Sequence, residues 1–368
     1  MKRILVTGGC GFIGRHVIGE LLQKKYRVRV VDSLVEQVHG TTRPAVPTGA
    51  ELIEGDIQDK NLVANALKDV DGVVHLAAEV GVGQSMYEIA RYVGGNDLGT
   101  AVLLEAMIGT PVRRLVVASS MSVYGEGLYT DNKGRRLDRV RRRAQDIKAG
   151  HWNPRGADHA ELLPIATDEE KPVDLASIYA LTKYAQERQV LIFGEAYGVG
   201  TVALRLFNVF GPGQALSNPY TGVLANFASR LANGQAPMIF EDGEQQRDFV
   251  HVRDVARAFR LALEQDEASG HVINIGSGQA YAIRDVAQLL ADAMGLPQMK
   301  PEIMNKARAG DIRNCFADIS KARALLGYEP RFRLEDSLGE LVEWVRTSEA
   351  VDRGMQMRQE LEARGLVS

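Results

Sequence analysis

The chain has 368 residues, of which 45% are apolar and 25% are charged, a composition typical of a globular protein with two domains or one large domain. Its formal net charge of −3 excludes an overall attraction to nucleic acid or to an anionic membrane surface, and no apolar stretch approaches the roughly 18 residues that span a bilayer. Two cysteines, Cys10 and Cys315, cannot form a disulfide framework or a four-cysteine zinc site, and they fit a reducing compartment.

The N-terminal residues carry an expectation about location. A basic start is followed by an apolar run, Ile4-Leu5-Val6, which ends at once in Thr7-Gly8-Gly9. This run is too short for the hydrophobic region of a signal peptide, so we expect a cytoplasmic protein without membrane partners.

Short β-branched runs alternate with amphipathic segments along the first part of the chain. The candidate strands are residues 3–6, 28–31, 51–54, 72–76, 115–119, 202–206 and 271–275. Residues 15–24 and 61–68 have the spacing of amphipathic helices. Because the strands are almost continuously apolar, they are expected to be parallel and buried on both faces. The alternation predicts an α/β fold with a doubly wound parallel Rossmann sheet.

After residue 206 the pattern becomes irregular, and helices are predicted at 283–294 and 335–344. We therefore predict a Rossmann domain over 1–204 and a smaller, mixed α/β substrate domain over 205–368. Residues 250–276 are expected to return to the first domain.

An insertion at about 127–170 interrupts the first domain and has no full-length strand or helix signal. It is rich in basic residues, namely Lys133, Arg135, Arg136, Arg139, Arg141, Arg142, Arg143 and Lys148. Two interpretations stay open: a solvated insertion, which is favoured, and a basic patch that binds phosphates or nucleic acid. The run has no interleaved aromatic side chains for base stacking, so we expect no nucleic-acid partner.

A glycine-rich loop follows the first strand and opens the first helix. Its sequence is Gly8-Gly9-Cys10-Gly11-Phe12-Ile13-Gly14. Glycines in this context allow a tight turn and let the backbone approach a pyrophosphate at the positive helix end. Asp32 ends the second strand, where a carboxylate would accept hydrogen bonds from ribose hydroxyls and repel a 2′-phosphate. These residues predict bound NAD rather than NADP; the alternative is a turn carboxylate without a ligand.

Two more strand ends are expected to face the same crevice. Asp56 and Ile57 follow the third strand, and Leu76, Ala77 and Ala78 follow the fourth. Small residues at this point leave room for a flat ligand, so these positions are assigned to cofactor binding. The neighbouring His75 is interpreted as a packed histidine rather than a catalytic one.

Tyr179 and Lys183 are four residues apart, so they share one face of a predicted helix. A nearby ammonium group is expected to lower the pKa of the tyrosine, which could then exchange a proton with a sugar hydroxyl. A serine at the end of the fifth strand would hold the same oxygen. A tyrosine and a lysine at this spacing are also common on helix surfaces, and the glycine loop and the serine strand favour the catalytic interpretation.

Together these motifs resemble the extended short-chain dehydrogenase/reductases, within them the NAD-dependent sugar-nucleotide epimerase/dehydratase branch, over nearly the whole chain. The resemblance assigns catalysis to Ser120, counted back from Tyr124, and to Tyr179 and Lys183. Ser119 is the less favoured serine.

The residues after Ser120 bear on the reaction. Dehydratase relatives carry Asp-Glu there, and decarboxylating relatives keep the glutamate, whereas this chain has Met121-Ser122. What remains resembles the 4-epimerases, which need only the serine, tyrosine, lysine and a tightly held NAD. For the substrate, the resemblance assigns Ser120, Ser122, Asn208, Phe240, Arg247 and Arg308. The two arginines suit a diphosphate because the guanidinium group forms bidentate hydrogen bonds.

Within the family the chain looks most like the dTDP-L-rhamnose 4-epimerase-like enzymes, on residues 216–222 and 240–243 and on the insertion. Three alternatives stay open: a UDP-sugar 4-epimerase with UDP-glucose or UDP-glucuronate as substrate, a 4-ketoreductase, and a non-catalytic NAD-sensing protein. The insertion has His151 and His159 but no cysteine, so no metal is predicted. The family commonly forms homodimers, here expected through residues 98–107 and 179–193.

Overall fold

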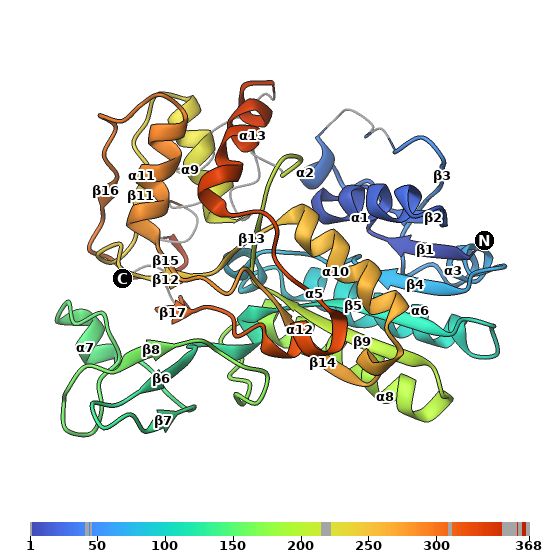
Figure 1. The fold of residues 1–368 in the computed structure, drawn as a ribbon, viewed down its shortest axis with the longest axis horizontal. Helices are drawn as coiled ribbons and strands as arrows, with labels where there is room; N and C mark the ends of the chain where they lie inside the picture. Colours follow the sequence, from blue (N-terminus) through green and yellow to red (C-terminus); the bar gives the residue numbers. More distant parts are fainter. Residues whose placement is uncertain are drawn as a thin grey trace.

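The structure is a computed structural model that describes residues 2–40, 44, 46–214, 222–307, 311–347, 359 and 363–365. A parallel seven-stranded sheet lies at its centre, in the order β14-β9-β5-β4-β1-β2-β3 (Figure 1). The strands are β1 Arg3–Thr7, β2 Arg27–Asp32, β3 Ala50–Glu54, β4 Gly72–His75, β5 Arg114–Ser120, β9 Gly200–Leu206 and β14 His271–Ile275. All seven strands expected from the sequence are present, and the predicted α/β class is confirmed.

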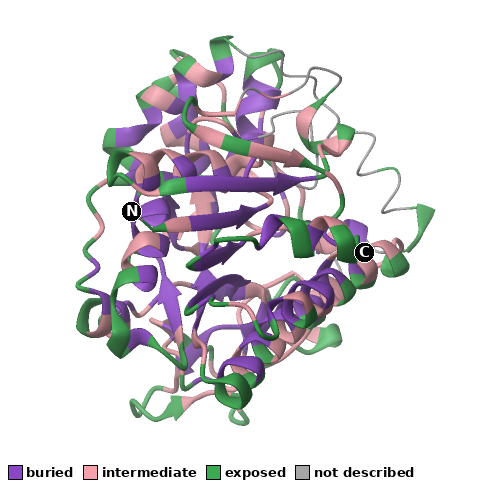
Figure 2. Ribbon diagram, turned by 90° about the vertical axis from the view of Figure 1, so that its right-hand side faces the viewer, coloured by how far each residue is buried: buried purple, intermediate pink, exposed green. Residues whose placement is uncertain are grey.

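Helices cover both faces of the sheet, and their inner sides form its two cores. On one face lie α1 Phe12–Gln23, α10 Val252–Glu264 and α12 Ser320–Leu326. On the other lie α3 Lys60–Ala66, α6 Gly99–Met107 and α8 Ile178–Tyr197. Figure 2 shows the buried strands between helices whose outer sides are exposed. β4 and β5 are buried along their whole length, which explains their almost continuous apolar sequence.

Short elements lie along the edge of the sheet where the parallel strands end. They are α2 Glu36–His39, α4 Val82–Ser85, α5 Ile89–Tyr92, the π-helix η1 Val93–Leu98, the 3₁₀-helix η2 Met121–Tyr124, and β10 Asn208–Phe210 paired with β13 Phe249–His251. The 3₁₀-helix η3 Asp266–Ala268 lies at the opposite edge, before β14. α8 has sharp ends: the hydroxyl of Ser177 accepts a hydrogen bond from the N–H of Ala180, and Gly198 ends the helix with φ +68°.

The C-terminal part has a core of its own, formed by α9 Val223–Ala232, α11 Ile283–Ala293 and α13 Leu334–Thr347. Two small sheets lie beside these helices: β11 Met238–Ile239 with β16 Glu302–Ile303, and β12 Gln246–Arg247 between β15 Tyr281–Ala282 and β17 Asn314–Cys315. By contrast, α10 packs on α1 and β14 is an edge strand of the large sheet. The role of the C-terminal part as a substrate domain stays a prediction.

The insertion is a small lobe with its own sheet, which the sequence did not predict. β6 Leu128–Thr130 pairs with β7 Arg136–Leu137 and β8 Leu163–Ile165, and α7 Ala144–Lys148 lies next to them (Figure 1). Tyr129, Val140 and Leu162 form its core. Strands of two or three residues are too short to give a periodic pattern, which explains why they were missed.

Candidate active site

A cavity of about 670 Å³ lies along the carboxyl edge of the large sheet. Its wall is formed by residues after β1, β2, β3, β4 and β9 and by the last three residues of β5. Of the residues predicted from the sequence, those that line it are Gly8, Gly11, Phe12, Ile13, Gly14, Asp32, Asp56, Ile57, Leu76, Ala77, Ala78, Ser120, Tyr179, Lys183 and Asn208. The edge of a doubly wound sheet at which the strand order reverses, here between β1 and β4, is where such folds bind ligands.

The glycine loop is packed so closely that side chains would not fit. Gly8 has φ +67°, and a Cβ atom there would lie 2.7 Å from the backbone nitrogen of Ala77. A Cβ on Gly14 would lie 2.5 Å from the carbonyl oxygen of Gly8. The first turn of α1 has neither a side-chain cap nor an acidic residue. Its N–H groups therefore present uncompensated positive charge, which suits a pyrophosphate.

Asp32 is held in place at the end of β2 and is 8% exposed. Its carboxylate accepts hydrogen bonds from the N–H groups of Cys10 and Leu34, at 2.8 and 2.9 Å. His39 Nε2 lies 3.4 Å from the same carboxylate, a contact that no sequence motif suggested. Burial opposes ionisation of Asp32, but these hydrogen bonds outweigh burial and hold its pKa below the usual value. The carboxylate is therefore a fixed, ionised acceptor at the cavity.

Ser120 and Tyr179 meet in the cavity although they are 59 residues apart in sequence. Ser120 is the last residue of β5, and its Oγ lies 2.5 Å from that of Ser122. A hydrogen bond with Ser120 lowers the pKa of Tyr179, but burial raises it by more. The net pKa of Tyr179 is therefore raised, whereas the sequence predicted a value lowered by Lys183. The reason is burial, which disfavours the charged phenolate. The ammonium group of Lys183 donates a hydrogen bond to Gln186, at 2.7 Å.

The competing serine, Ser119, has a different environment. Its hydroxyl donates to Glu187 at 2.8 Å, and Glu187 also receives two hydrogen bonds from Arg205, at 2.7 and 2.9 Å. All three residues are buried. Ser119 also lines the cavity, but its hydroxyl is committed to a buried ion pair, in contrast to that of Ser120.

The residues assigned to the substrate are only partly brought together. Asn208 lines the cavity, and its Oδ1 atom is buried without a hydrogen-bond partner in the described residues, so it can accept one from a ligand. Phe240, Arg247 and Ser122 are not among the lining residues. The guanidinium group of Arg247 donates to the carbonyl oxygens of Gln246, Ile312 and Arg313. Arg308 lies outside the described residues.

Several lining residues were not predicted. Arg91 pairs with Glu79 at 2.7 Å and donates to Gln37 at 2.8 Å, so a polar bridge connects α5 to the segment after β2. Gly94 and Gly95 line the cavity at the π-helix η1, a local irregularity that is common at functional sites. Their spacing matches no simple motif, so only the structure places them here.

His75 is the packed histidine that the sequence suggested: it is 1% exposed, and burial lowers its pKa to about 3. Within the described ranges, no group of three or more histidine, cysteine or acidic side chains could hold a metal ion. Nor does this part of the chain contain a helix long and apolar enough to cross a membrane.

Comparison with known proteins agrees with this geometry. The model of the NAD dependent epimerase/dehydratase family matches residues 4–276. A dTDP-L-rhamnose 4-epimerase from Burkholderia thailandensis is 37% identical over 351 residues, covering 94% of this chain and 95% of that protein. A putative UDP-glucose 4-epimerase from Methanocaldococcus jannaschii is 32% identical, covering 94% and 99%. The solved UDP-glucose 4-epimerase of Thermotoga maritima with UDP-glucose has a TM-score of 0.76 and 32% identity, covering 94% and 98%.

The chain belongs to the NAD-dependent epimerase/dehydratase family. It is an NAD-dependent epimerase, an isomerase, and the expected cofactor is confirmed as NAD. The residues present fit this cofactor. Gly8 and Gly14 have no room for a Cβ atom, so only glycine lets the loop backbone pack this closely beside the helix end that suits a pyrophosphate. The ionised Asp32 can accept hydrogen bonds from a ribose.

Proposed function

We propose that the protein is a 4-epimerase of a nucleotide-linked sugar, with a dTDP-6-deoxyhexose such as dTDP-L-rhamnose as substrate. One observation carries the proposal: Ser120, Tyr179 and Lys183 line the same cavity as the glycine loop and Asp32. A hydroxyl, a phenol and an ammonium group thereby lie beside the place where the family holds its cofactor. When bound, NAD would supply the hydride acceptor and donor for carbon 4, and the hydride would return to the opposite face of the transient ketone.

The protein's own groups hold the reacting oxygen and move its proton. Ser120, hydrogen-bonded to Ser122 and to Tyr179, would donate a hydrogen bond to the oxygen on carbon 4. Tyr179 would take the hydroxyl proton as carbon 4 is oxidised, and give it back when the ketone is reduced. Lys183 would stabilise the phenolate form of Tyr179, which exists before Tyr179 takes the proton and again after it gives the proton back. Burial raises the pKa of Tyr179, and the positive charge of Lys183 would lower it again.

The acidic residues of the cavity favour epimerisation over dehydration. The acidic side chains among its described lining residues are Asp32, Asp56 and Glu79. Asp32 is held by backbone N–H groups, Glu79 pairs with Arg91, and Asp56 accepts from the N–H of Gln58 at 2.9 Å. Next to Ser120 stand Met121 and Ser122, neither of which can protonate a leaving hydroxyl. A second acid–base group, which dehydration requires, is therefore not offered beside Ser120.

The choice of sugar nucleotide rests on sequence similarity to known epimerases and on a hydrogen-bond acceptor at Asn208 that is free within the described residues. The relative from Burkholderia thailandensis, a dTDP-L-rhamnose 4-epimerase, is the more similar of the two relatives compared, at 37% identity against 32%. Asn208 offers an acceptor toward a substrate, and Arg247 and Arg308 stay proposed ligands of the diphosphate. A UDP-sugar, with glucose or glucuronate, is the second candidate.

The test is to incubate the purified protein separately with dTDP-L-rhamnose, UDP-glucose and UDP-glucuronate, without added reductant. Proton NMR follows the signal of the hydrogen on carbon 4 of the sugar. Conversion of dTDP-L-rhamnose to a stable mixture of two stereoisomers is expected. Conversion of a UDP-sugar alone would correct the substrate, and conversion of none by protein that contains NAD would contradict the proposal.

A homodimer is also proposed, and exposed apolar side chains support it. Leu181 and Ile192 on α8 are 45% and 56% exposed, and their spacing of 11 residues puts them on one helix face. Val93 and Leu98 on the adjacent η1 are 40% and 52% exposed. Such a patch is typical of an interface between two subunits.

A further inference from the structure

We propose that Gln186 is a positioning residue that fixes the ammonium group of Lys183 at the cavity. The inference rests on the role of Lys183 proposed above. Gln186 lies one turn after Lys183 on α8 and is 1% exposed, while Lys183 is 3% exposed. Lys183 Nζ donates to Gln186 Oε1 at 2.7 Å. A buried ammonium group needs such an acceptor, because burial otherwise strongly disfavours its charge.

The amide of Gln186 can point only one way, because a chain of hydrogen bonds fixes it. Its Nε2 atom lies 2.9 Å from Thr100 Oγ1. The hydroxyl of Thr100 donates its proton to the carbonyl oxygen of Asn96, at 2.6 Å, so the Thr100 oxygen is left as an acceptor. Gln186 therefore donates to Thr100, and its oxygen must face Lys183. A flipped amide would place an NH₂ group against the ammonium.

His75 completes this network as a neutral side chain. Its Nε2 atom lies 2.9 Å from the same Thr100 oxygen and 3.3 Å from Gln186 Nε2, so it can either donate to Thr100 or accept from the Gln186 amide. Its Nδ1 atom lies 2.7 Å from Thr7 Oγ1, which accepts from the N–H of Ala77 at 3.2 Å and so can donate to Nδ1. Both ring nitrogens are satisfied without a second proton, and burial disfavours the charged form of His75.

The consequence is that Lys183 has one neutral, rigid anchor and no positively charged neighbour in the network. The titratable groups that face it are Tyr179 and Glu187 from α8 and His75 from β4. Glu187 favours the ammonium form, but it is already engaged by Arg205 and Ser119. Burial lowers the pKa of Lys183 to about 7, so the ammonium form depends on each remaining acceptor. Gln186 is the acceptor in direct hydrogen-bond contact.

Two substitutions of Gln186 separate positioning from mere packing. Gln186→Leu removes the acceptor, so the pKa of Lys183 falls and the alkaline limb of the kcat profile moves to lower pH. Gln186→Glu keeps an acceptor and adds a negative charge, so the limb moves to higher pH while kcat is retained. Losing one hydrogen bond to a charged group lowers kcat of Gln186→Leu about ten- to a hundredfold at pH 8, with KM for the sugar nucleotide unchanged.

Gln189→Leu, on the next turn of α8 and outside the network, is the matched control and keeps the parent profile. A readout without turnover is the histidine nitrogen NMR spectrum, in which His75 is expected to be neutral at pH 6–8. Alkaline limbs of Gln186→Leu and Gln186→Glu that do not move in opposite directions, or a positively charged His75 in this pH range, would overturn the role of Gln186. An active Lys183→Met variant would instead overturn the proposed function.

Discussion

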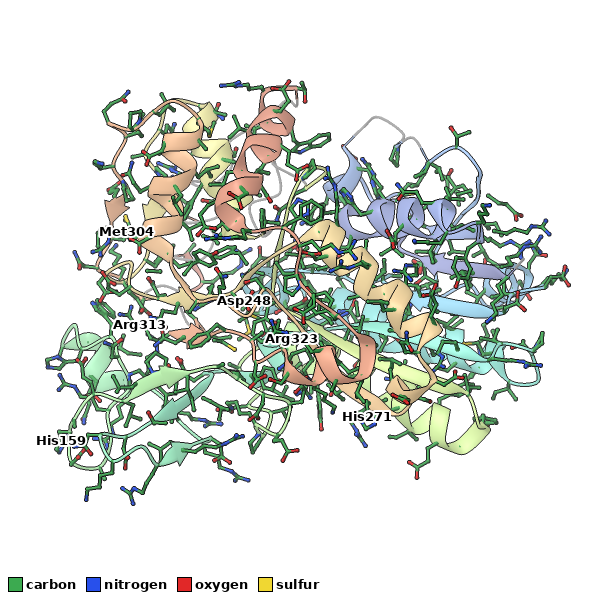
Figure 3. The ribbon with its side chains drawn as sticks, in the orientation of Figure 1. His159, Asp248, His271, Met304, Arg313 and Arg323 are labelled. Atoms are coloured by element: carbon green, nitrogen blue, oxygen red, sulfur yellow. The ribbon has the colours of Figure 1, made fainter. Side chains whose placement is uncertain are left out.

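A buried cluster of charges joins the insertion lobe to the C-terminal part, and it makes the insertion testable. Arg142, from the lobe, contacts Glu126 at 3.0 Å and also Glu241 and the carbonyl oxygen of Asp311. Glu241 also pairs with Arg313, at 3.0 Å. Figure 3 labels Arg313 at the junction of the lobe with the C-terminal part. The side chains of Arg142, Glu126 and Glu241 are 6%, 8% and 1% exposed.

Substituting Arg142 with methionine leaves two buried carboxylates with one cation fewer. Breaking a buried ion pair in this way costs about 3–5 kcal/mol of unfolding free energy. The adjacent Arg141 is the matched control, because its pair with Asp174 is on the surface and its side chain is 80% exposed. Loss of a surface pair costs about 0–1 kcal/mol. The assay is urea unfolding of Arg142→Met, Arg141→Met and the parent, with the slope of the transition compared as well as its midpoint.

The pH dependence of this difference gives a second check. Burial raises the pKa of Glu241, and Arg142 and Arg313 pull it back in part. Without Arg142 the pKa rises further above its unfolded value. A group with a raised folded pKa loses its contribution to stability as pH rises through that value. Arg142→Met is therefore expected to be more destabilised at pH 8 than at pH 5. Equal losses for Arg142→Met and Arg141→Met, or no dependence on pH, would refute this reasoning.

Three further predictions concern the cavity and the dimer. Gly14→Ala places a Cβ atom 2.5 Å from the Gly8 carbonyl oxygen and should reduce the amount of NAD that copurifies with the protein. The control, Gly19→Ala on the same helix, meets nothing within 4 Å and should raise the free energy of unfolding by up to about 1 kcal/mol. Retention of the parent's NAD by Gly14→Ala would contradict the close packing of the loop. Tyr179→Phe removes only the hydroxyl, so kcat measured by NMR should fall about 10²–10⁴-fold while NAD, quantified after denaturation, stays bound; substantial remaining turnover would contradict the proton-transfer role. Leu181→Asp together with Ile192→Asp should convert a dimer to a monomer in sedimentation experiments, and an unchanged oligomer would exclude this face as the interface.

The sequence alone predicted the central architecture, and the reason is physical. Each strand of a doubly covered parallel sheet is buried on both faces, so it leaves an almost continuous apolar run. β5 and β9 are of this kind, and both were located within about one or two residues. The glycine loop was equally readable, since a positive φ at Gly8 and the missing room at Gly14 permit no other residue type. Tyr179 and Lys183 could be assigned from the sequence because they match the family motif.

What the sequence could not predict depends on contacts between distant segments. The short strands of the lobe form because Leu128 and Ile165 pair across 37 residues, not because of any local pattern. Arg141 and Arg142 are the same residue type at adjacent positions, but Arg142 is buried between two carboxylates and Arg141 is exposed. The same is true of electrostatics at the site.

The spacing of Tyr179 and Lys183 predicted a tyrosine whose pKa is lowered by its neighbour. The tertiary structure instead buries both residues and turns the ammonium group to Gln186, whose amide is fixed by Thr100 from another helix. Sequence thus determined the fold and the identities of the reactive groups, because local conformation and burial pattern leave direct marks on residue type. Only the tertiary structure decided the partners and the pKa of each group, because solvation and hydrogen bonding depend on what the folded chain brings alongside.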